Sequence, residues 1–98
     1  MSTEHYNKEI EEQKKEKECI AKAMGQAIRL LRNNKKLSQG KVCKKGNIDP
    51  VVFQRYDTGK VAPGIYNLLK IAKGIEIHPS KILEKAVEFL NSDAENNE

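Results

Sequence analysis

The sequence predicts an all-α domain of five core helices, on the strength of three observations. Apolar residues recur every three or four positions through residues 20–90, as they do along one face of a helix. Capping residues, glycines and prolines stand where these segments meet. No segment alternates apolar and polar residues as a half-buried strand would. The 98 residues are enough for one compact domain.

Composition excludes several classes of protein. Apolar residues make up 38% of the chain and charged residues 33%, with no tryptophan, which fits a small globular domain with an aliphatic core. No apolar run is long enough to span a membrane, and residues 1–18 lack the apolar stretch of a signal peptide. Cys19 and Cys43 are too few for a disulfide scaffold. We therefore expect a cytoplasmic protein that does not associate with membranes.

Residues 1–18 form a charged extension rich in glutamate and lysine. The pair Glu11 and Lys15 has the i,i+4 spacing that supports a helix, but apolar side chains are almost absent from this segment. We expect it to be either a solvated helix or disordered. The folded domain is expected over residues 19–90. The polar and acidic residues 91–98 are expected to form a disordered tail.

The first two core helices follow the extension. The first carries apolar residues at helical spacing: Ile20, Met24, Ala27, Ile28 and Leu31. The second is short, with Ser38 as its N-cap and with Val42 and Cys43 on its buried face. Gly46 and Asn47 follow, and both residue types accept the left-handed backbone conformation that ends a helix.

The third helix is predicted to begin directly after this turn. Asp49 is an acidic N-cap, and Pro50 occupies the favoured first helical position. Phe53 and Tyr56 are three residues apart and are expected to point into the core. Thr58 and Gly59 end the helix.

Two further helices follow the loop of residues 60–64. The fourth carries these apolar residues: Ile65, Leu68, Leu69, Ile71 and Ala72. It is expected to close at Gly74. Pro79 begins the fifth helix, with His78 in the N-cap position. The apolar stripe of the fifth helix consists of Ile82, Leu83, Ala86, Val87 and Leu90.

Positive charge is concentrated in the middle of the chain. Residues 23–83 carry a net charge of +9, whereas residues 1–22 carry −1 and residues 84–98 carry −4. A basic block between acidic or neutral flanks favours a polyanionic partner, and nucleic acid is the first candidate. A solvated basic surface without a partner would give the same distribution.

The second and third helices have the arrangement of a helix-turn-helix motif, in which two short helices are joined by a tight turn. The matching residues are Leu37-Ser38-Gln39, Val42-Cys43, Asn47-Ile48, Phe53, Arg55-Tyr56-Asp57, Gly59 and Pro63. In this order and spacing they resemble the Xre family, the Cro and lambda-repressor type of DNA-binding domain. The resemblance runs without gaps from Gly25 to Leu83. It implies a five-helix, lambda-repressor-like helix-turn-helix domain, here with an N-terminal helical extension.

The resemblance also implies roles for individual residues. The recognition helix of the family reads base edges from its exposed N-terminal face, which here carries Pro50, Val51, Gln54 and Arg55. Arg55 could bond guanine and Gln54 adenine, each pairing being worth ~1–3 kcal/mol of discrimination, and Val51 could touch a thymine methyl group. Arg32 and Asp57 occupy the places of an internal salt bridge that also offers the arginine to a phosphate. The candidate phosphate contacts are Arg29, Arg32, Gln39, Lys41, Lys44, Lys45 and Lys60.

This chain departs from the family pattern at a few positions. Pro50 has no amide hydrogen to donate from the helix N-terminus. Gly40 weakens the second helix by ~1 kcal/mol relative to alanine. Val51 and Val52 stand where the family usually has small polar residues, and burial against a partner or a neighbouring helix is the alternative role for them.

Other chemistry has no support in the sequence. His5 and His78 lie far apart, and neither shares a metal-ligand spacing with a cysteine. Cys43 is better explained as a small buried side chain than as a nucleophile. We expect no cofactor, no metal and no enzymatic activity.

Two functions remain compatible with the sequence. The first is a sequence-specific, repressor-like transcription regulator that inserts its third core helix into the major groove of double-stranded DNA at the nucleoid. Val87, Phe89 and Leu90 extend past the family match. They either cap the core of the monomer or, as we expect, form the interface of a homodimer. The second is a protein-interaction module of the same fold, an antitoxin-like or co-activator-like adaptor that binds its partner through the N-terminal extension or the acidic tail.

Overall fold

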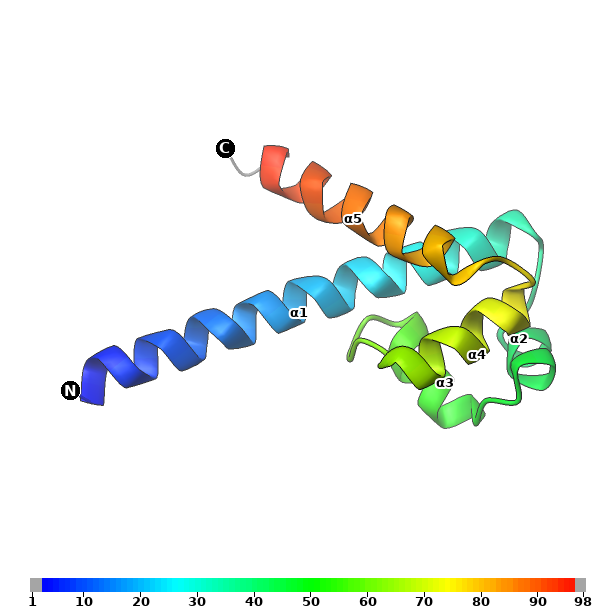
Figure 1. Ribbon diagram of the computed structural model, residues 1–98, viewed down its shortest axis with the longest axis horizontal. Coiled ribbons are helices and arrows are strands. Elements are labelled where there is room, and N and C mark those ends of the chain that lie inside the picture. The colour runs from blue at the N-terminus through cyan, green and yellow to red at the C-terminus, as the bar shows by residue number, and fades with distance from the viewer. Residues whose placement is uncertain (1–2, 97–98) are drawn as a thin grey trace.

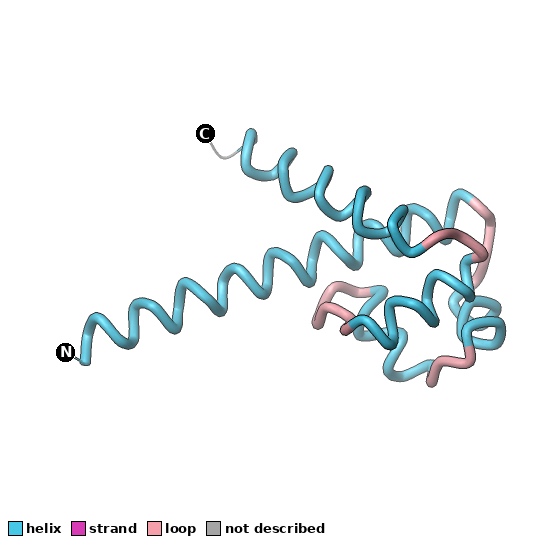
Figure 2. The backbone as a smooth tube through the Cα atoms, in the orientation of Figure 1, coloured by secondary structure: helices cyan, strands magenta, loops and turns pink. Residues whose placement is uncertain are grey.

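The computed structural model describes the backbone of residues 3–96 and the side chains of residues 8–93, and this part of the chain holds five α-helices and no strand. The helices are α1 (Thr3–Asn34), α2 (Gln39–Gly46), α3 (Pro50–Asp57), α4 (Ile65–Ile75) and α5 (Pro79–Asn96). Short loops connect them (Figure 2). The predicted all-α fold is confirmed.

The first helix is much longer than the core requires. Its 32 residues span about 48 Å at 1.5 Å per residue, close to the 50 Å length of the whole molecule. Residues 8–20 are all exposed, and Ala21 is the first buried residue among those whose side chains are described. Figure 1 shows this N-terminal half projecting beyond the other helices. The described part of the charged extension is therefore a solvated helix that continues without a break into the core.

The core lies on both sides of the C-terminal half of α1. In Figure 1, α5 lies above α1, and α2, α3 and α4 lie below it. The largest fully buried hydrophobic side chains are Ile28, Val42, Phe53, Ile71, Ile75 and Ile82, so every helix contributes at least one. Phe53 is the only aromatic among them, which agrees with the aliphatic core expected from composition.

A close approach of backbones fixes α3 against α1. A Cβ atom added to Gly25 would stand 2.7 Å from the Cα atom of Gly59, a distance that real Cβ contacts do not reach. Gly59 itself has φ +78°, in the left-handed region that favours glycine. The end of α3 therefore rests directly on α1, because neither position carries a side chain.

Helix termini agree with most of the capping residues expected from sequence. The Ser38 hydroxyl oxygen accepts a hydrogen bond from the Lys41 amide at 3.2 Å and caps α2. Asn47 ends that helix in the left-handed conformation, with φ 55°. Helix α4 runs one residue past Gly74, and Glu76 forms its left-handed C-cap.

The expectation of a disordered tail over residues 91–98 is not met where the structure describes it. Helix α5 continues to Asn96, so residues 91–96 are helical. These residues include Asn91, Ser92 and Asp93, which are weak helix formers. They are helical because they continue a helix that packing against α1 has already ordered. Residues 97 and 98 lie outside the described part of the chain.

Several residues assigned to apolar helix faces are not buried within the monomer. Ile65 and Leu69 of α4 are 72% and 53% exposed, because the buried face of α4 is formed by residues 68, 71, 72 and 75. Leu83 and Val87 of α5 are 46% and 52% exposed, although Ile82 beside them is fully buried. Both stripes are thus wider than the core that they cover. No helix within residues 3–96 combines the length and apolar character needed to cross a bilayer.

The two cysteines have opposite environments, which gives a direct test of the packing. Cys43 is buried; burial, followed by the nearby charges of Asp49 and Asp57, raises the pKa of its thiol. Cys19 is exposed on α1. Because the thiolate is the reactive form, we expect a maleimide to modify Cys19 in the native protein and Cys43 only after denaturation. Mass spectrometry of labelled peptides measures this; rapid native labelling of Cys43 would contradict the packing of α2.

Candidate nucleic-acid interface

Helices α2 and α3 form a helix-turn-helix pair. Only three residues, 47–49, separate them, which matches the short turn of this motif. Ile48 in this turn is 6% exposed, and its amide donates to the Cys43 carbonyl oxygen at 3.0 Å. The turn is therefore anchored in the core, and the orientation of α3 relative to α2 is fixed.

One face of α3 is exposed and holds the candidate base-reading residues. Pro50, Val51, Gln54 and Arg55 are all exposed, with Val51 at 64%. The opposite face, with Phe53 and Tyr56, is buried. Val52 is half-buried against the core, so of the two valines only Val51 projects into solvent.

The N-terminal amides of α3 are already occupied. The Asp49 carboxylate oxygen accepts from the amides of Val51 at 2.8 Å and of Val52 at 3.2 Å. Pro50 has no amide hydrogen to offer. This terminus therefore stabilises the helix but has few donors left for a phosphate, so any reading of DNA by α3 must use side chains.

A buried carboxylate fixes the other end of α3. Asp57 is 1% exposed, and we call it and its three partners, Arg29, Arg32 and Gln39, the Asp57 cluster. Arg32 donates from Nε to Oδ1 at 3.1 Å and from a terminal nitrogen to Oδ2 at 3.2 Å. The Gln39 amide donates to Oδ2 at 2.8 Å, and Arg29 donates to the Asp57 backbone carbonyl. The cluster joins α1, the start of α2 and the end of α3.

Three of the candidate phosphate contacts belong to the Asp57 cluster and bond within the protein. The Arg32 side chain is only 12% exposed and also donates to the Leu37 carbonyl oxygen at 3.0 Å. Arg29 and Gln39 likewise donate to acceptors of the protein itself. The predicted pair of Arg32 with Asp57 is present as a bidentate contact, and all three residues hold the helices in position.

The lysine candidates are more accessible. Lys41, Lys44 and Lys60 are exposed, and among the described residues none of them makes an ion pair. Lys45 instead forms an ion pair with Glu76, with Nζ 2.7 Å from Oε1. Its hydrogen bond and charge lower the pKa of the Glu76 carboxyl. Three lysines on and beside α2 and α3 are thus free to meet a polyanion.

Sequence reasoning missed a cluster on α4. Ile65, Tyr66 and Leu69 are 72%, 71% and 53% exposed and form what we call the α4 patch. The Lys70 ammonium lies 4.4 Å from the centre of the Tyr66 ring, a cation–π contact. The i,i+1,i+4 spacing could have revealed this patch, but helical periodicity alone does not separate a core face from a neighbouring face.

No group of acidic, histidine or cysteine side chains among the described residues has the arrangement of a metal site. The candidate site consists of the exposed face of α3, the two ends that fix this helix, and the lysines around it. Its chemistry is that of an exposed, basic surface with one arginine and one glutamine available for hydrogen bonds.

Known structures share this fold. No protein-family model matches the sequence, and no curated protein matches it significantly. The restriction-modification controller protein C.AhdI from Aeromonas hydrophila is 27% identical, with a TM-score of 0.59 over 63% of this chain and 94% of that chain. The clp gene regulator ClgR from C. glutamicum is 16% identical, with a TM-score of 0.65 over 70% and 90%. A mutant of the restriction-modification controller protein C.Esp1396I is 20% identical, with a TM-score of 0.66 over 72% and 95%.

These similarities cover about two thirds of this chain and nearly the whole length of each solved chain. The helix-turn-helix fold implied by the resemblance to the Xre family is thereby confirmed.

Proposed function

We propose that this chain is a sequence-specific, repressor-like transcription regulator that inserts α3 into the major groove of double-stranded DNA. The observation that carries the proposal is the exposed face of α3, which is fixed at one end by Asp49 and at the other by the Asp57 cluster. The similar structures are those of a gene regulator and of restriction-modification controllers, which supports the same class of function.

The dimensions and side chains of α3 suit this role. An α-helix with its side chains is about 10–12 Å across, which fits the ~12 Å width of the major groove. The eight residues of α3 span about 12 Å along the helix axis. Arg55 offers the planar fork that bonds the O6 and N7 atoms of guanine, and Gln54 can pair with adenine. Lys41, Lys44 and Lys60 would neutralise phosphates, which adds affinity without sequence information.

The proposed regulator acts as a homodimer. Two recognition helices related by a two-fold axis would contact half-sites ~34 Å apart. The exposed apolar residues of α5 support this arrangement, but they are not all the residues that the sequence suggested. Phe89 and Leu90 are half-buried against the core, whereas Val87 and Leu83 are about half exposed and available to a partner.

Two neighbouring lysines give a prediction about salt dependence. Lys44→Ala should reduce the slope of log affinity against log salt by about one, because one released counterion is lost. Lys45→Ala should reduce it by less, since Lys45 must leave Glu76 before it can meet a phosphate. Fluorescence titrations of a labelled duplex at several salt concentrations measure both slopes. A larger loss for Lys45→Ala than for Lys44→Ala would contradict the assigned roles.

The proposed function is tested by binding to DNA of random and of selected sequence. We expect steeply salt-dependent binding to a random duplex and, after selection from a random-sequence pool, enrichment of a palindrome. Salt-dependent binding without enrichment would contradict sequence specificity. No binding even at low salt would contradict DNA binding altogether.

A protein-interaction module is the second candidate function, and the α4 patch favours it. Monomeric proteins rarely leave several large neighbouring hydrophobic side chains exposed without a partner. An antitoxin-like or co-activator-like adaptor would use such a surface, together with the helical extension or the acidic end of α5. It would be indifferent to Arg55→Ala and to Lys44→Ala, which separates it from the DNA-binding regulator.

A further inference from the structure

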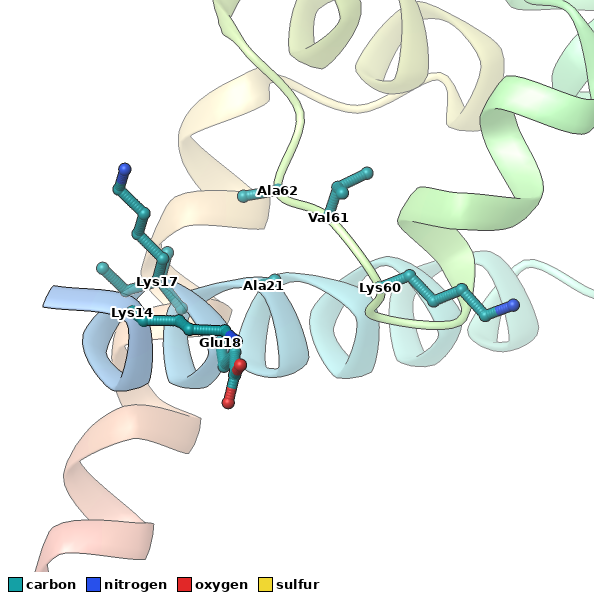
Figure 3. A pocket seen from close by; sticks show the side chains of 8 residues that line it. Lys14, Lys17, Glu18, Ala21, Lys60, Val61 and Ala62 are labelled. Carbon is teal, nitrogen blue, oxygen red and sulfur yellow. The ribbon is translucent and has the colours of Figure 1, made fainter. Parts of the chain in front are cut away.

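A groove runs between α1 and the loop that joins α3 to α4 (Figure 3). Its volume is about 420 Å³. Ile20 and Val61, each 45% exposed, line it together with Ala62. These aliphatic side chains give the groove an apolar surface that is partly exposed to solvent in the monomer. We call this feature the α1 groove.

The edges of the α1 groove are basic. Lys14 and Lys17 lie on one turn of α1, and Lys60 lies on the opposite side at the start of the loop (Figure 3). Among the described residues that line it, Glu18 is the only acidic one, so this lining carries a net charge of +2. An apolar groove with basic edges suits a ridge that is apolar at its centre and acidic at its sides.

Helix α5 of this same chain carries exposed side chains of this composition. Leu83 and Val87 are 46% and 52% exposed and stand one helical turn apart. Glu84 and Glu88 stand directly beside them, and their side chains are 64% and 65% exposed. We call these four residues the α5 ridge. Their neighbours Ile82 and Ala86 are buried against the core, so the ridge faces away from its own chain.

The glutamates of the ridge are held only loosely within the monomer. Glu84 lies 3.9 Å from Lys81, and Glu88 lies 2.8 Å from Lys85. Exposed i,i+3 pairs of this kind contribute little and are screened by salt. The carboxylates are therefore available to lysines on another molecule.

We propose that the α5 ridge of one copy of this chain docks into the α1 groove of a second copy, and that a two-fold axis makes the contact twice. The ridge supplies aliphatic side chains for the apolar surface, and Glu84 and Glu88 meet Lys14 and Lys17. The charges favour this occupant: two α5 ridges facing each other would oppose four carboxylates, and two α1 grooves would oppose two linings that each carry a net charge of +2. This inference deepens the proposed homodimer by naming its two surfaces.

Charge reversal tests the docking on the full chain without DNA. One variant reverses the groove, with Lys14→Glu and Lys17→Glu, and a second reverses the ridge, with Glu84→Lys and Glu88→Lys. Each variant alone should have a homodimer dissociation constant raised by about tenfold or more, because every altered contact occurs twice. An equimolar mixture of the two should form heterodimers of about wild-type affinity, since both grooves then meet ridges of opposite charge. Sedimentation equilibrium measures all four samples, and circular dichroism checks that each variant keeps its helices.

Leu69→Glu is the matched control, because Leu69 is as exposed as Val87 but belongs to the α4 patch. We expect this substitution to leave the dimer intact. A monomeric wild-type protein, a groove variant that dimerises normally, or a mixture that stays monomeric would each overturn the docking. Dissociation by Leu69→Glu with unchanged groove and ridge variants would assign the interface to the α4 patch instead.

This inference rests on the proposed function, and the same samples test the two independently. Titration with a random duplex measures DNA binding of the wild-type protein directly. A dimer that follows the charge-reversal pattern but ignores DNA would leave the docking standing and contradict the regulator. Salt-dependent DNA binding by a dimer that the charge reversals do not affect would support the regulator and contradict the docking.

Discussion

Asp57→Ala is expected to lower the free energy of unfolding by about 3–5 kcal/mol, because it removes the buried acceptor that Arg32 and Gln39 share. Arg32 would keep a charged group only 12% exposed, and the Gln39 amide would lose its 2.8 Å hydrogen bond. The contact joins three helices, so its loss cannot be absorbed by one of them. Since small domains are stable by only ~5–15 kcal/mol, the variant should be close to unfolding at room temperature. Urea denaturation followed by circular dichroism measures the change.

The aspartate at the other end of the same helix is the control. Asp49 is exposed and caps two amides, so Asp49→Ala should cost about 0.5–2 kcal/mol, the range for N-cap removal. Equal losses at the two positions would show that the Asp57 cluster adds nothing beyond an ordinary cap. Asp57 would then have no special part in holding α3.

Arg55→Ala is expected to have the largest effect on sequence recognition. The proposed bidentate bond to guanine is worth ~1–3 kcal/mol, so affinity for the selected site should fall about 5- to 150-fold. Arg55 is exposed, and its loss should change stability by no more than about 0.5 kcal/mol. Affinity for a random duplex should fall only by the contribution of one positive charge. Parallel titrations with selected and random duplexes measure the difference.

Arg55→Lys separates base reading from charge. Lysine keeps the positive charge but not the planar fork, so specific affinity should fall while random-duplex affinity stays unchanged. If Arg55→Lys binds the selected site as tightly as the wild type, Arg55 contacts a phosphate and the specificity resides elsewhere on the exposed face of α3.

Much of the fold could be predicted from sequence because its signals are local. Ser38, Asp49 and Pro50 mark helix starts by chemistry that depends only on the adjacent backbone. Phe53 and Tyr56 are buried, as their spacing predicts. These features do not depend on where the other helices lie, so one sequence was enough to identify them.

The parts that could not be predicted depend on contacts between distant segments. Residues 91–96 are polar and lack a local signal for order, but they continue a helix that packs on α1. Leu69 and Val87 have the spacing of core residues, and only the placement of neighbouring helices shows that they face solvent. The partners of Gln39 and Arg29 likewise emerge only once Asp57 is brought beside them from 18 and 28 residues away.

The most direct test of α3 as the recognition helix is DNA cleavage by a probe attached to it. Gln54→Cys in a Cys19→Ser background gives one reactive thiol on the exposed face of α3, because Cys43 is buried. An iron chelate coupled there should cut the selected site within each half-site, where α3 lies in the major groove. The same chelate on Asn91→Cys of α5, which lies on the other side of α1 in Figure 1, should cut weakly or not at all. Strong cutting from position 91 with none from position 54 would contradict the proposed mode of binding.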